Sequence, residues 1–280
     1  MKIYDCFSYW DEDLLLEARL NIMNDFVDFF VIVEGNKTWQ NNFKKLRFDL
    51  NKFQQFKDKI IYIPVEDMPD GDNPYERENF QRNCISRGIR EANDLDLIII
   101  SDLDEIPNPL SIKNFNQSMR YAVFEQKLYY YKFNLFCDRY DWYGSKGCKK
   151  KKLLDFEWLR NTKPKKYKPF RLDTFFSNTK YINVKIINDG GWHFTQLKNI
   201  KDLYEKLTNS EDHQEFKDAN QSIKEIEILM RKKVINYDHK VKKNNYKFSN
   251  EFKLQTVSLD NLPEYIKNNK DKFKDWIDMY

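Results

Sequence analysis

The chain has 280 residues, of which 41% are hydrophobic, and a mean hydropathy of −0.82. This length is ample for one α/β domain with a sizeable core. No stretch approaches the ~18 uninterrupted apolar residues of a membrane span, which excludes a chain built on membrane-spanning helices. The net charge of +4 hides an asymmetry, because residues 1–140 carry −6 and residues 141–280 carry +10.

Cysteine and glycine usage indicates the cell compartment and the kind of nucleotide site to expect. The four cysteines are widely spaced and form no Cys-x-x-Cys pair, which indicates packing residues in a reducing cytosol. The first residues lack a basic head followed by an apolar stretch, so we expect no secretory signal, a cytoplasmic location and no integral membrane segment. With only 7 glycines and no glycine-rich phosphate loop, any nucleotide must be held in another way.

The first 110 residues alternate between short apolar runs and helical segments. Repeated strand–helix units with right-handed crossovers predict a mixed, mostly parallel, doubly wound sheet. Asn73 and Pro74 form a cap and first turn for the second helix. The expected strands are 2–8, 29–33, 59–64 and 97–100. The expected helices are one that starts with the acids at 11–13 and runs to about 24, and one over 75–92.

Beyond Pro109 the pattern changes. The aromatic-rich segment from Met119 to Phe136 predicts one long or two shorter strands, added antiparallel to the sheet. Most of its aromatics are interpreted as core, whereas Trp142 and Tyr143, beside Gly144, are candidates for stacking on a sugar.

The last 140 residues are basic and end in helices. A lysine-rich run, which includes Lys166, is interpreted as a solvated face, with binding of phosphates or nucleic acid as the alternatives. An alternating strand is expected over 181–187. From about Asn199 the chain is expected to be helical, with an amphipathic helix over 223–234 and a terminal helix over 262–280.

An acidic motif follows the most apolar run of the chain. Asp102, Asp104 and Glu105 come where the chain leaves this strand, and Pro107 and Pro109 forbid its continuation. The carboxyl edge of an open α/β sheet is where ligands bind, and clustered carboxylates there attract a divalent cation such as Mg²⁺ or Mn²⁺. The alternative is a solvated acidic turn that caps a core strand.

Two further residues suit a metal–diphosphate site. Arg82 lies on the helix before the acidic strand and can make a forked contact with a diphosphate, although pairing with Glu78 at four-residue spacing explains it equally well. His193 follows Gly190 and Gly191 and offers a nitrogen ligand that Mn²⁺ tolerates. The alternative for His193 is a structural histidine.

Several segments occur in chain order and form a recognisable set. They are Ile3-Tyr4-Asp5-Cys6-Phe7, Phe30-Val31-Ile32-Val33-Glu34 with Lys37-Thr38, Arg77-Glu78-Asn79-Phe80-Gln81-Arg82-Asn83, Ser101-Asp102-Leu103-Asp104-Glu105-Ile106-Pro107 and Gly191-Trp192-His193-Phe194. With them the chain resembles, from residue 2 to about 215, glycosyltransferase family 17, which includes the β-1,4-mannosyl-glycoprotein β-1,4-N-acetylglucosaminyltransferases. The resemblance implies a GT-A-type nucleotide-sugar transferase fold, a UDP-sugar donor, a divalent metal and inversion at the anomeric carbon.

The resemblance also implies roles for individual residues. Asp104 would ligate the metal, and Asp102 would approach the ribose or the metal's water shell. His193 would complete the metal coordination, and Arg82 would match the family's basic residue before the acidic motif. Asp5 and Glu34, each expected at the end of a strand, would flank the uridine pocket.

Inversion requires a carboxylate that takes the proton of the acceptor hydroxyl, a task typically worth roughly 10²–10⁴-fold. We assign this base to Asp189, which lies on an expected flexible turn near His193. Glu157, Asp155 and Glu105 remain alternatives.

The expected organisation is a catalytic region over 1–198, with a nucleotide-binding half (1–110) and an acceptor and metal half (111–198). Residues 199–280 are expected as a helical extension packed on it. The predicted function is a metal-dependent, inverting transfer of a sugar, N-acetylglucosamine by resemblance, from a UDP-sugar to a saccharide. The alternatives are a basic nucleic-acid-binding protein without catalysis and a metal-dependent nucleotidyltransferase on a related fold.

Overall fold

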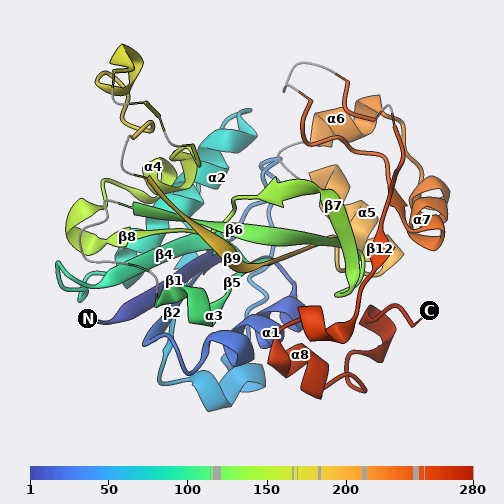
Figure 1. Cartoon of the computed structure of the whole chain (residues 1–280), viewed down its shortest axis with the longest axis horizontal. Coiled ribbons are helices and arrows are strands. Elements are labelled where there is room, and N and C mark those ends of the chain that lie inside the picture. The colour runs from blue at the N-terminus through green and yellow to red at the C-terminus, as the bar shows by residue number, and fades with distance from the viewer. Residues whose placement is uncertain are drawn as a thin grey trace.

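The computed structural model describes residues 1–113, 115, 121–165, 167–168, 170–181, 184–209, 213–241, 246–248 and 250–279. Met119, the expected start of a strand, and Lys166 lie outside these residues. The described chain forms a mixed α/β fold around one large sheet (Figure 1). Its strands are β1 (Ile3–Ser8), β2 (Phe29–Gly35), β3 (Ile60–Val65), β4 (Leu97–Asp102), β5 (Glu105–Pro107), β6 (Tyr121–Tyr130), β7 (Leu135–Trp142), β8 (Lys146–Lys149), β9 (Val184–Thr195) and β12 (Gln255–Thr256).

The helices cover the sheet and form the C-terminal part of the fold. They are α1 (Asp13–Met23), α2 (Pro74–Asn83), α3 (Pro109–Ile112), α4 (Phe156–Asn161), α5 (Ile200–Asn209), α6 (His213–Asp218), α7 (Ile223–Lys232) and α8 (Glu264–Asn268). A small second sheet pairs β10 (Val234–Ile235) with β11 (Phe252–Lys253). None of the helices in the described part of the chain is long and apolar enough to cross a bilayer.

One half of the sheet is parallel, as the apolar runs predict. Strands β3, β2, β1 and β4 lie side by side in that order, and Cys6 of β1 pairs with both Val31 of β2 and Ile100 of β4. The chain steps outward from β1 to β3 and then returns, so that β4 lies on the other side of β1. The switch point, where such sheets bind ligands, therefore lies between the carboxyl ends of β1 and β4.

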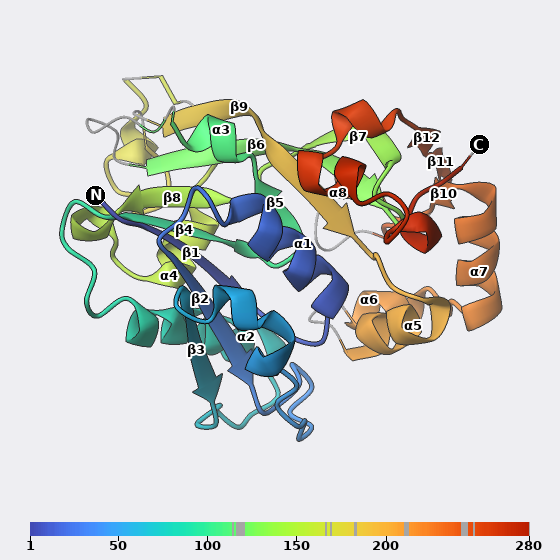
Figure 2. The ribbon, with the colours of Figure 1, turned by 90° about the horizontal axis from the view of Figure 1, so that it is seen from below.

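The other half is mostly antiparallel (Figure 2). Strand β8 separates β4 from β6, and β7 and β12 follow towards the far edge. The aromatic-rich segment forms the long strand β6 and, up to Phe136, only the first two residues of β7, which pairs antiparallel with β6 and continues to Trp142. Strand β9 runs parallel to β6 and also pairs with β5.

Two apolar cores lie on opposite faces of the sheet, which makes it doubly wound. On one face α1 and α8 pack through residues such as Leu16 and Ile266, together with Phe273. On the other face the segment after α2 and helix α4 pack through Ile85 and Phe156. Burial of these side chains holds β1 and β4, and hence the switch point, in a rigid frame.

Helix α2 begins as predicted but is shorter. The side chain of Asn73 accepts a hydrogen bond from the Tyr75 amide, and Pro74 opens the helix. The helix ends at Asn83 instead of Ala92, and a 3-10 turn follows as far as Gly88. A Cβ atom at Gly88 would lie 2.5 Å from Val31 of β2, so the turn packs more closely on the sheet than a continued helix of larger residues allows.

The C-terminal region contains helices, as expected, but it is not purely helical. Helix α7 begins with a capping box between Ser222 and Glu225, and it packs with α5 and α6 on a third core beside β6 and β7. Strand β12 extends the large sheet by pairing with β7. The expected terminal helix is interrupted: α8 ends at Asn268, and a 3-10 turn at Lys274–Trp276 follows.

Candidate active site

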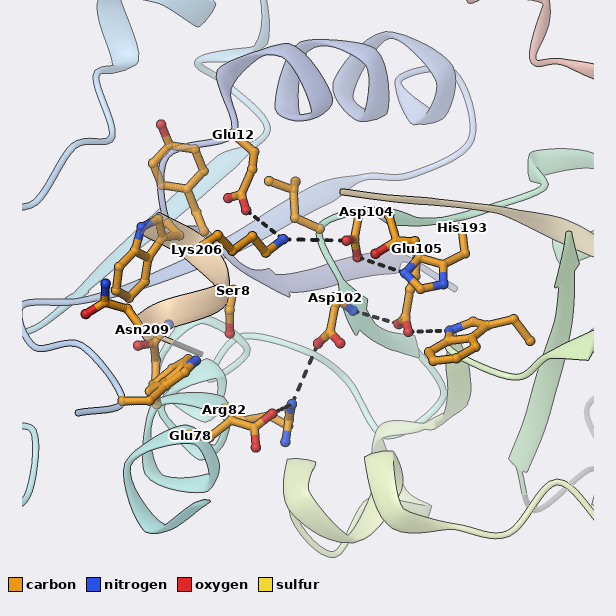
Figure 3. A pocket seen from close by; sticks show the side chains of 17 residues that line it. Ser8, Glu12, Glu78, Arg82, Asp102, Asp104, Glu105, His193, Lys206 and Asn209 are labelled. Carbon is orange, nitrogen blue, oxygen red and sulfur yellow. Dashed lines mark hydrogen bonds and ion pairs between the residues drawn. The ribbon is translucent and has the colours of Figure 1, made fainter. Parts of the chain in front are cut away.

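A cleft of about 270 Å³ opens at the switch point (Figure 3). Ser8 at the end of β1 and Asp102 at the end of β4 form its floor, and Asp104 follows in the loop between β4 and β5. Helix α2 contributes Arg82, and helix α5 of the C-terminal region contributes Lys206. The cleft therefore combines residues that are far apart in the sequence.

Asp102 faces two arginines. Its Oδ2 lies 2.5 Å from Nη2 of Arg160, and its Oδ1 lies 3.6 Å from Nη2 of Arg82. Arg82 also contacts Glu78 at 2.5 Å, so the ion pair at four-residue spacing and the approach to the acidic motif are both present. The Asp102 side chain remains 45% exposed, which leaves it accessible from the cleft.

Glu105 is fully buried beneath the cleft and holds the motif in shape. Its carboxylate receives two hydrogen bonds from Arg160, at 2.6 and 2.9 Å, one from the Trp142 indole at 2.7 Å and one from the Asp102 amide at 2.9 Å. Burial opposes ionisation, but Arg160 outweighs it and lowers the pKa of Glu105 to about 2. A Cβ atom at Gly144 would lie 2.2 Å from this carboxyl group, so only glycine fits there.

Asp104 and His193 lie together on the opposite side of the cleft. The Asp104 Oδ1 is 3.5 Å from the His193 Nε2, and its Oδ2 is 3.8 Å from the Lys206 Nζ. Pairing of β5 with β9 produces this arrangement, because His193 is directly opposite Glu105. Burial opposes ionisation of Asp104, but His193 and Lys206 outweigh it and lower its pKa.

Lys206 also links the cleft to helix α1. Its ammonium lies 3.1 Å from the carboxylate of Glu12, which Lys198 approaches at 3.8 Å. Burial of Glu12 would raise its pKa, but the two lysines lower it to about 2. The acidic side of the cleft is thus balanced by lysines from the C-terminal region.

Asp104 and His193 fit a divalent cation. Two adjacent ligands of an octahedral ion, each at roughly 2.1 Å, are about 3 Å apart, close to the 3.5 Å between Oδ1 and Nε2. Among the described residues, no three His, Cys, Asp or Glu side chains form a metal-binding group. Asp102 fits less well as a direct ligand, because both of its oxygens face arginines. Further ligands would have to be phosphate oxygens or water.

Glu34 lies near the end of its strand as predicted, but Asp5 does not. Asp5 lies in the middle of β1, fully buried, and pairs with Arg19 at 2.6 Å, so the expectation that it ends a strand is wrong. Glu34 is also fully buried; it accepts hydrogen bonds from the amides of Arg47 and Phe48 and forms an ion pair with Lys44. Neither residue lines the cleft.

The assignment of Asp189 as the base is not supported. Asp189 is exposed, has φ of 50° and does not line the cleft. The expected flexible turn is a bulge inside β9, where the register with β6 shifts. Gly191 has φ of 137°, and a Cβ atom there would lie 2.1 Å from the Ile106 carbonyl oxygen. This glycine therefore permits the close contact between β9 and β5 and does not act as a hinge.

The alternative bases also have structural partners. Asp155 caps α4 by accepting a hydrogen bond from the Trp158 amide, and Glu157 accepts one from Asn79. Glu105 is held by Arg160. The carboxylates that do line the cleft are Glu12, Glu78, Asp102, Asp104 and Glu105.

Sequence reasoning missed Arg160, Lys206 and Glu12. Arg160 lies beside the lysine-rich run, which was interpreted as a solvated face, and nothing in its neighbourhood distinguishes it. Glu12 is expected only as one of the acids at the start of the first helix, and it is the N-cap residue of α1. Trp142, noted as a stacking candidate, does line the cleft, although it ends β7 and is not in a loop.

The chain is similar in sequence to known glycosyltransferases. The model of glycosyltransferase family 17 matches residues 1–277. The beta-1,4-mannosyl-glycoprotein 4-beta-N-acetylglucosaminyltransferases of Homo sapiens and Rattus norvegicus are each 30% identical over 104 residues, covering 33% of this chain and 19% of theirs. The match thus spans about a fifth of the length of these relatives.

Among solved structures, the inositol-1-phosphate CTP transferase from T. maritima aligns with 75% of this chain and 97% of its own. The TM-score is 0.35 and the identity 14%.

Proposed function

The chain belongs to glycosyltransferase family 17, and from this premise we propose that it transfers N-acetylglucosamine from a UDP-sugar to a saccharide hydroxyl. The reaction is metal-dependent, inverts the anomeric carbon and takes place on a GT-A-type fold. The family and its curated relatives support the sugar, because the relatives are named as N-acetylglucosaminyltransferases.

One observation carries the proposal: Asp104 and His193 meet at the switch point of the sheet, with cationic side chains on both sides. A hard divalent cation prefers carboxylate oxygens, completes its shell with phosphate oxygens, and tolerates a histidine when it is Mn²⁺. The donor diphosphate would therefore lie between Asp104 and Arg82. No other group of cleft residues combines these properties in the described chain.

The chain's own residues then have distinct tasks. Asp104 and His193 would hold the metal, which when bound supplies positive charge to the leaving diphosphate. Arg82 would contact the phosphate oxygens and stabilise the same charge. Arg160 and Glu105 act as positioning residues, because they fix Asp102 and do not themselves reach the open part of the cleft.

Donor binding is the first test. Thermal unfolding of the full chain should be measured with UDP-, GDP- and dTDP-sugars, each with and without Mn²⁺. We expect a rise in Tm for a UDP-sugar that requires Mn²⁺, since a ligand at 100 times its Kd stabilises by about 2.7 kcal/mol. With a saccharide acceptor the released product should be UDP. Release of pyrophosphate from a nucleoside triphosphate and a sugar 1-phosphate would instead identify a nucleotidyltransferase and refute the proposal.

A further inference from the structure

A second cavity of about 290 Å³ adjoins the cleft. The two share the side chains of Trp142, His193, Thr195 and Lys206 as a common wall. The second cavity lies between strands β6 and β7 and helices α5, α6 and α7, beside the third core. A molecule in it would therefore reach the place where the donor sugar is expected.

Aromatic rings line much of this cavity. Tyr130 and Tyr131 come from the end of β6, and Tyr237, His239 and Phe248 come from the segment after β10. His239 lies at the centre of the group: its ring centroid is 4.8 Å from that of Tyr237, and its Nε2 is hydrogen-bonded to the Tyr130 hydroxyl. Aromatic faces of this kind suit the C–H faces of a sugar ring.

Trp142 separates the second cavity from the cleft and is held rigidly. Its indole N–H donates to Glu105, and its ring lies 4.5 Å from that of His193 and 5.3 Å from that of His239. The same side chain therefore contacts the candidate metal ligand on one side and the aromatic cavity on the other. Trp142 therefore fixes the position of the second cavity relative to the cleft.

Three amide side chains on the cavity wall have no partner. Gln196, Gln221 and Asn236 are half-buried, and none of the three side chains forms a hydrogen bond within the described part of the chain. Each amide offers both donors and acceptors, and at these half-buried positions they remain accessible to a ligand. Sugar hydroxyls, which also donate and accept, are suitable partners.

The lining is nearly uncharged. Its described residues include no Asp, Glu or Arg, and Lys206 is engaged with Glu12 and Asp104. Burial lowers the pKa of His239 to about 4, with His193 and Lys247 adding to the effect and Asp238 opposing it, so this ring is neutral at physiological pH. An anionic sugar would find no free cation here, whereas a neutral one is accommodated.

We propose that the second cavity binds the neutral pyranose of the acceptor, whose hydroxyl receives the donor sugar. This inference rests on the proposed function. In the transfer, the acceptor oxygen bonds to the anomeric carbon as the sugar–diphosphate bond breaks; UDP leaves with the bonding pair, and the hydroxyl proton passes to a carboxylate of the cleft and from it to water. Aromatic faces and the three amides select a neutral saccharide as the substrate class.

The test uses saturation-transfer NMR on the full chain. The probes are the methyl glycosides of mannose, galactose, glucose and N-acetylglucosamine, with glucuronic acid as the anionic comparison. We expect at least one neutral glycoside to bind, and the Gln221→Ala/Asn236→Ala variant to bind it at least tenfold more weakly. Gln55→Ala is the matched control. It removes an exposed amide that does not line the cavity, and this variant should bind like the wild type.

Three results would overturn the inference: no neutral glycoside binds, glucuronic acid binds as tightly as the best neutral glycoside, or the double variant binds like the wild type. The donor is measured separately, through the Mn²⁺-dependent rise in Tm with UDP-sugar. Absence of that rise refutes the proposed function, whereas absence of the glycoside signal with the rise intact refutes only the cavity assignment.

Discussion

Two arginines hold the acidic motif from opposite sides, and they do so in different surroundings. Arg19 is fully buried and pairs with Asp5, while its Nη1 donates to the carbonyl oxygens of Asp102, Leu103 and Glu105 at 2.8–3.1 Å. Arg160 instead binds carboxylates, those of Asp102 and Glu105, close to the cleft. One arginine therefore fixes the backbone of the motif and the other fixes its side chains.

The difference shows how similar ion pairs serve different purposes. The Arg19–Asp5 pair has no exposed surface, so it contributes to the fold and has no access to a ligand. The Arg160 network leaves Asp102 45% exposed and directs it into the cleft. We therefore expect substitutions in the first network to affect stability and those around the cleft to affect turnover.

The largest effect is expected for Arg19→Met. This change leaves the Asp5 carboxylate buried without its cation, and breaking such a pair costs about 3–5 kcal/mol. The free energy of unfolding, measured by urea denaturation, should fall by that amount. The Asp5→Asn/Arg19→Met double variant is the control and should recover part of the loss, because no unpaired charge remains; equal stability of wild type and Arg19→Met would contradict the structural role of the pair.

Asp104→Asn should affect turnover and leave the fold intact. Asparagine has the same shape but lacks the charge that a divalent cation requires. We expect Mn²⁺-dependent release of UDP to fall by about 10²–10³-fold, as when one electrostatic contact to the transition state is removed. The Tm without ligands should change little. Wild-type turnover in this variant would exclude Asp104 from the site.

Arg160→Met should reverse the pH dependence of the contribution that Glu105 makes to the free energy of unfolding. In the wild type the pKa of Glu105 is lowered to about 2, so its contribution to stability is complete above its ordinary pKa of 4.5 and is lost as pH falls towards 2. Without Arg160, burial raises the pKa of Glu105. Its contribution then exists at low pH and is lost as pH rises through the raised value.

Urea denaturation of both proteins between pH 3 and 8 measures this inversion. At neutral pH we also expect Arg160→Met to lose about 1–3 kcal/mol of the free energy of unfolding, because the buried Glu105 carboxylate loses two of its hydrogen-bond donors and its cation. Parallel pH profiles for the two proteins would show that Arg160 does not control the ionisation of Glu105.

The parallel half of the fold and the acidic motif were predictable because their signals are local. Continuous apolar runs such as Ile98–Ile100 identify buried strands, and Asp102 and Asp104 follow one of them directly. Parallel strands bring their carboxyl ends to one edge, so the position of the motif followed from strand order. Arg82 and His193, both placed at the same site by the sequence, lie 3.6 Å from Asp102 and 3.5 Å from Asp104, whereas their roles toward a diphosphate and a metal stay predictions.

The remaining site residues depend on contacts that no local pattern encodes. Asp5 was misplaced because the sequence does not show that Arg19, one helix later, neutralises it inside the sheet. Arg160 reaches Glu105 across 55 positions, from a segment whose composition resembles any basic surface. Lys206 arrives from a helix that was expected only to pack on the catalytic region.

The smallest effect is expected for Asp189→Asn, which tests the corrected position of this residue. Asp189 is exposed and lies outside the cleft, and its contact with Asn108 uses its backbone carbonyl, which the substitution preserves. Asparagine tolerates the φ of 50° well, so stability should change by no more than about 0.5 kcal/mol. UDP release should match the wild type at every pH measured. A loss of turnover with unchanged donor binding would restore Asp189 as the base and would require β9 to shift towards the cleft when substrates bind.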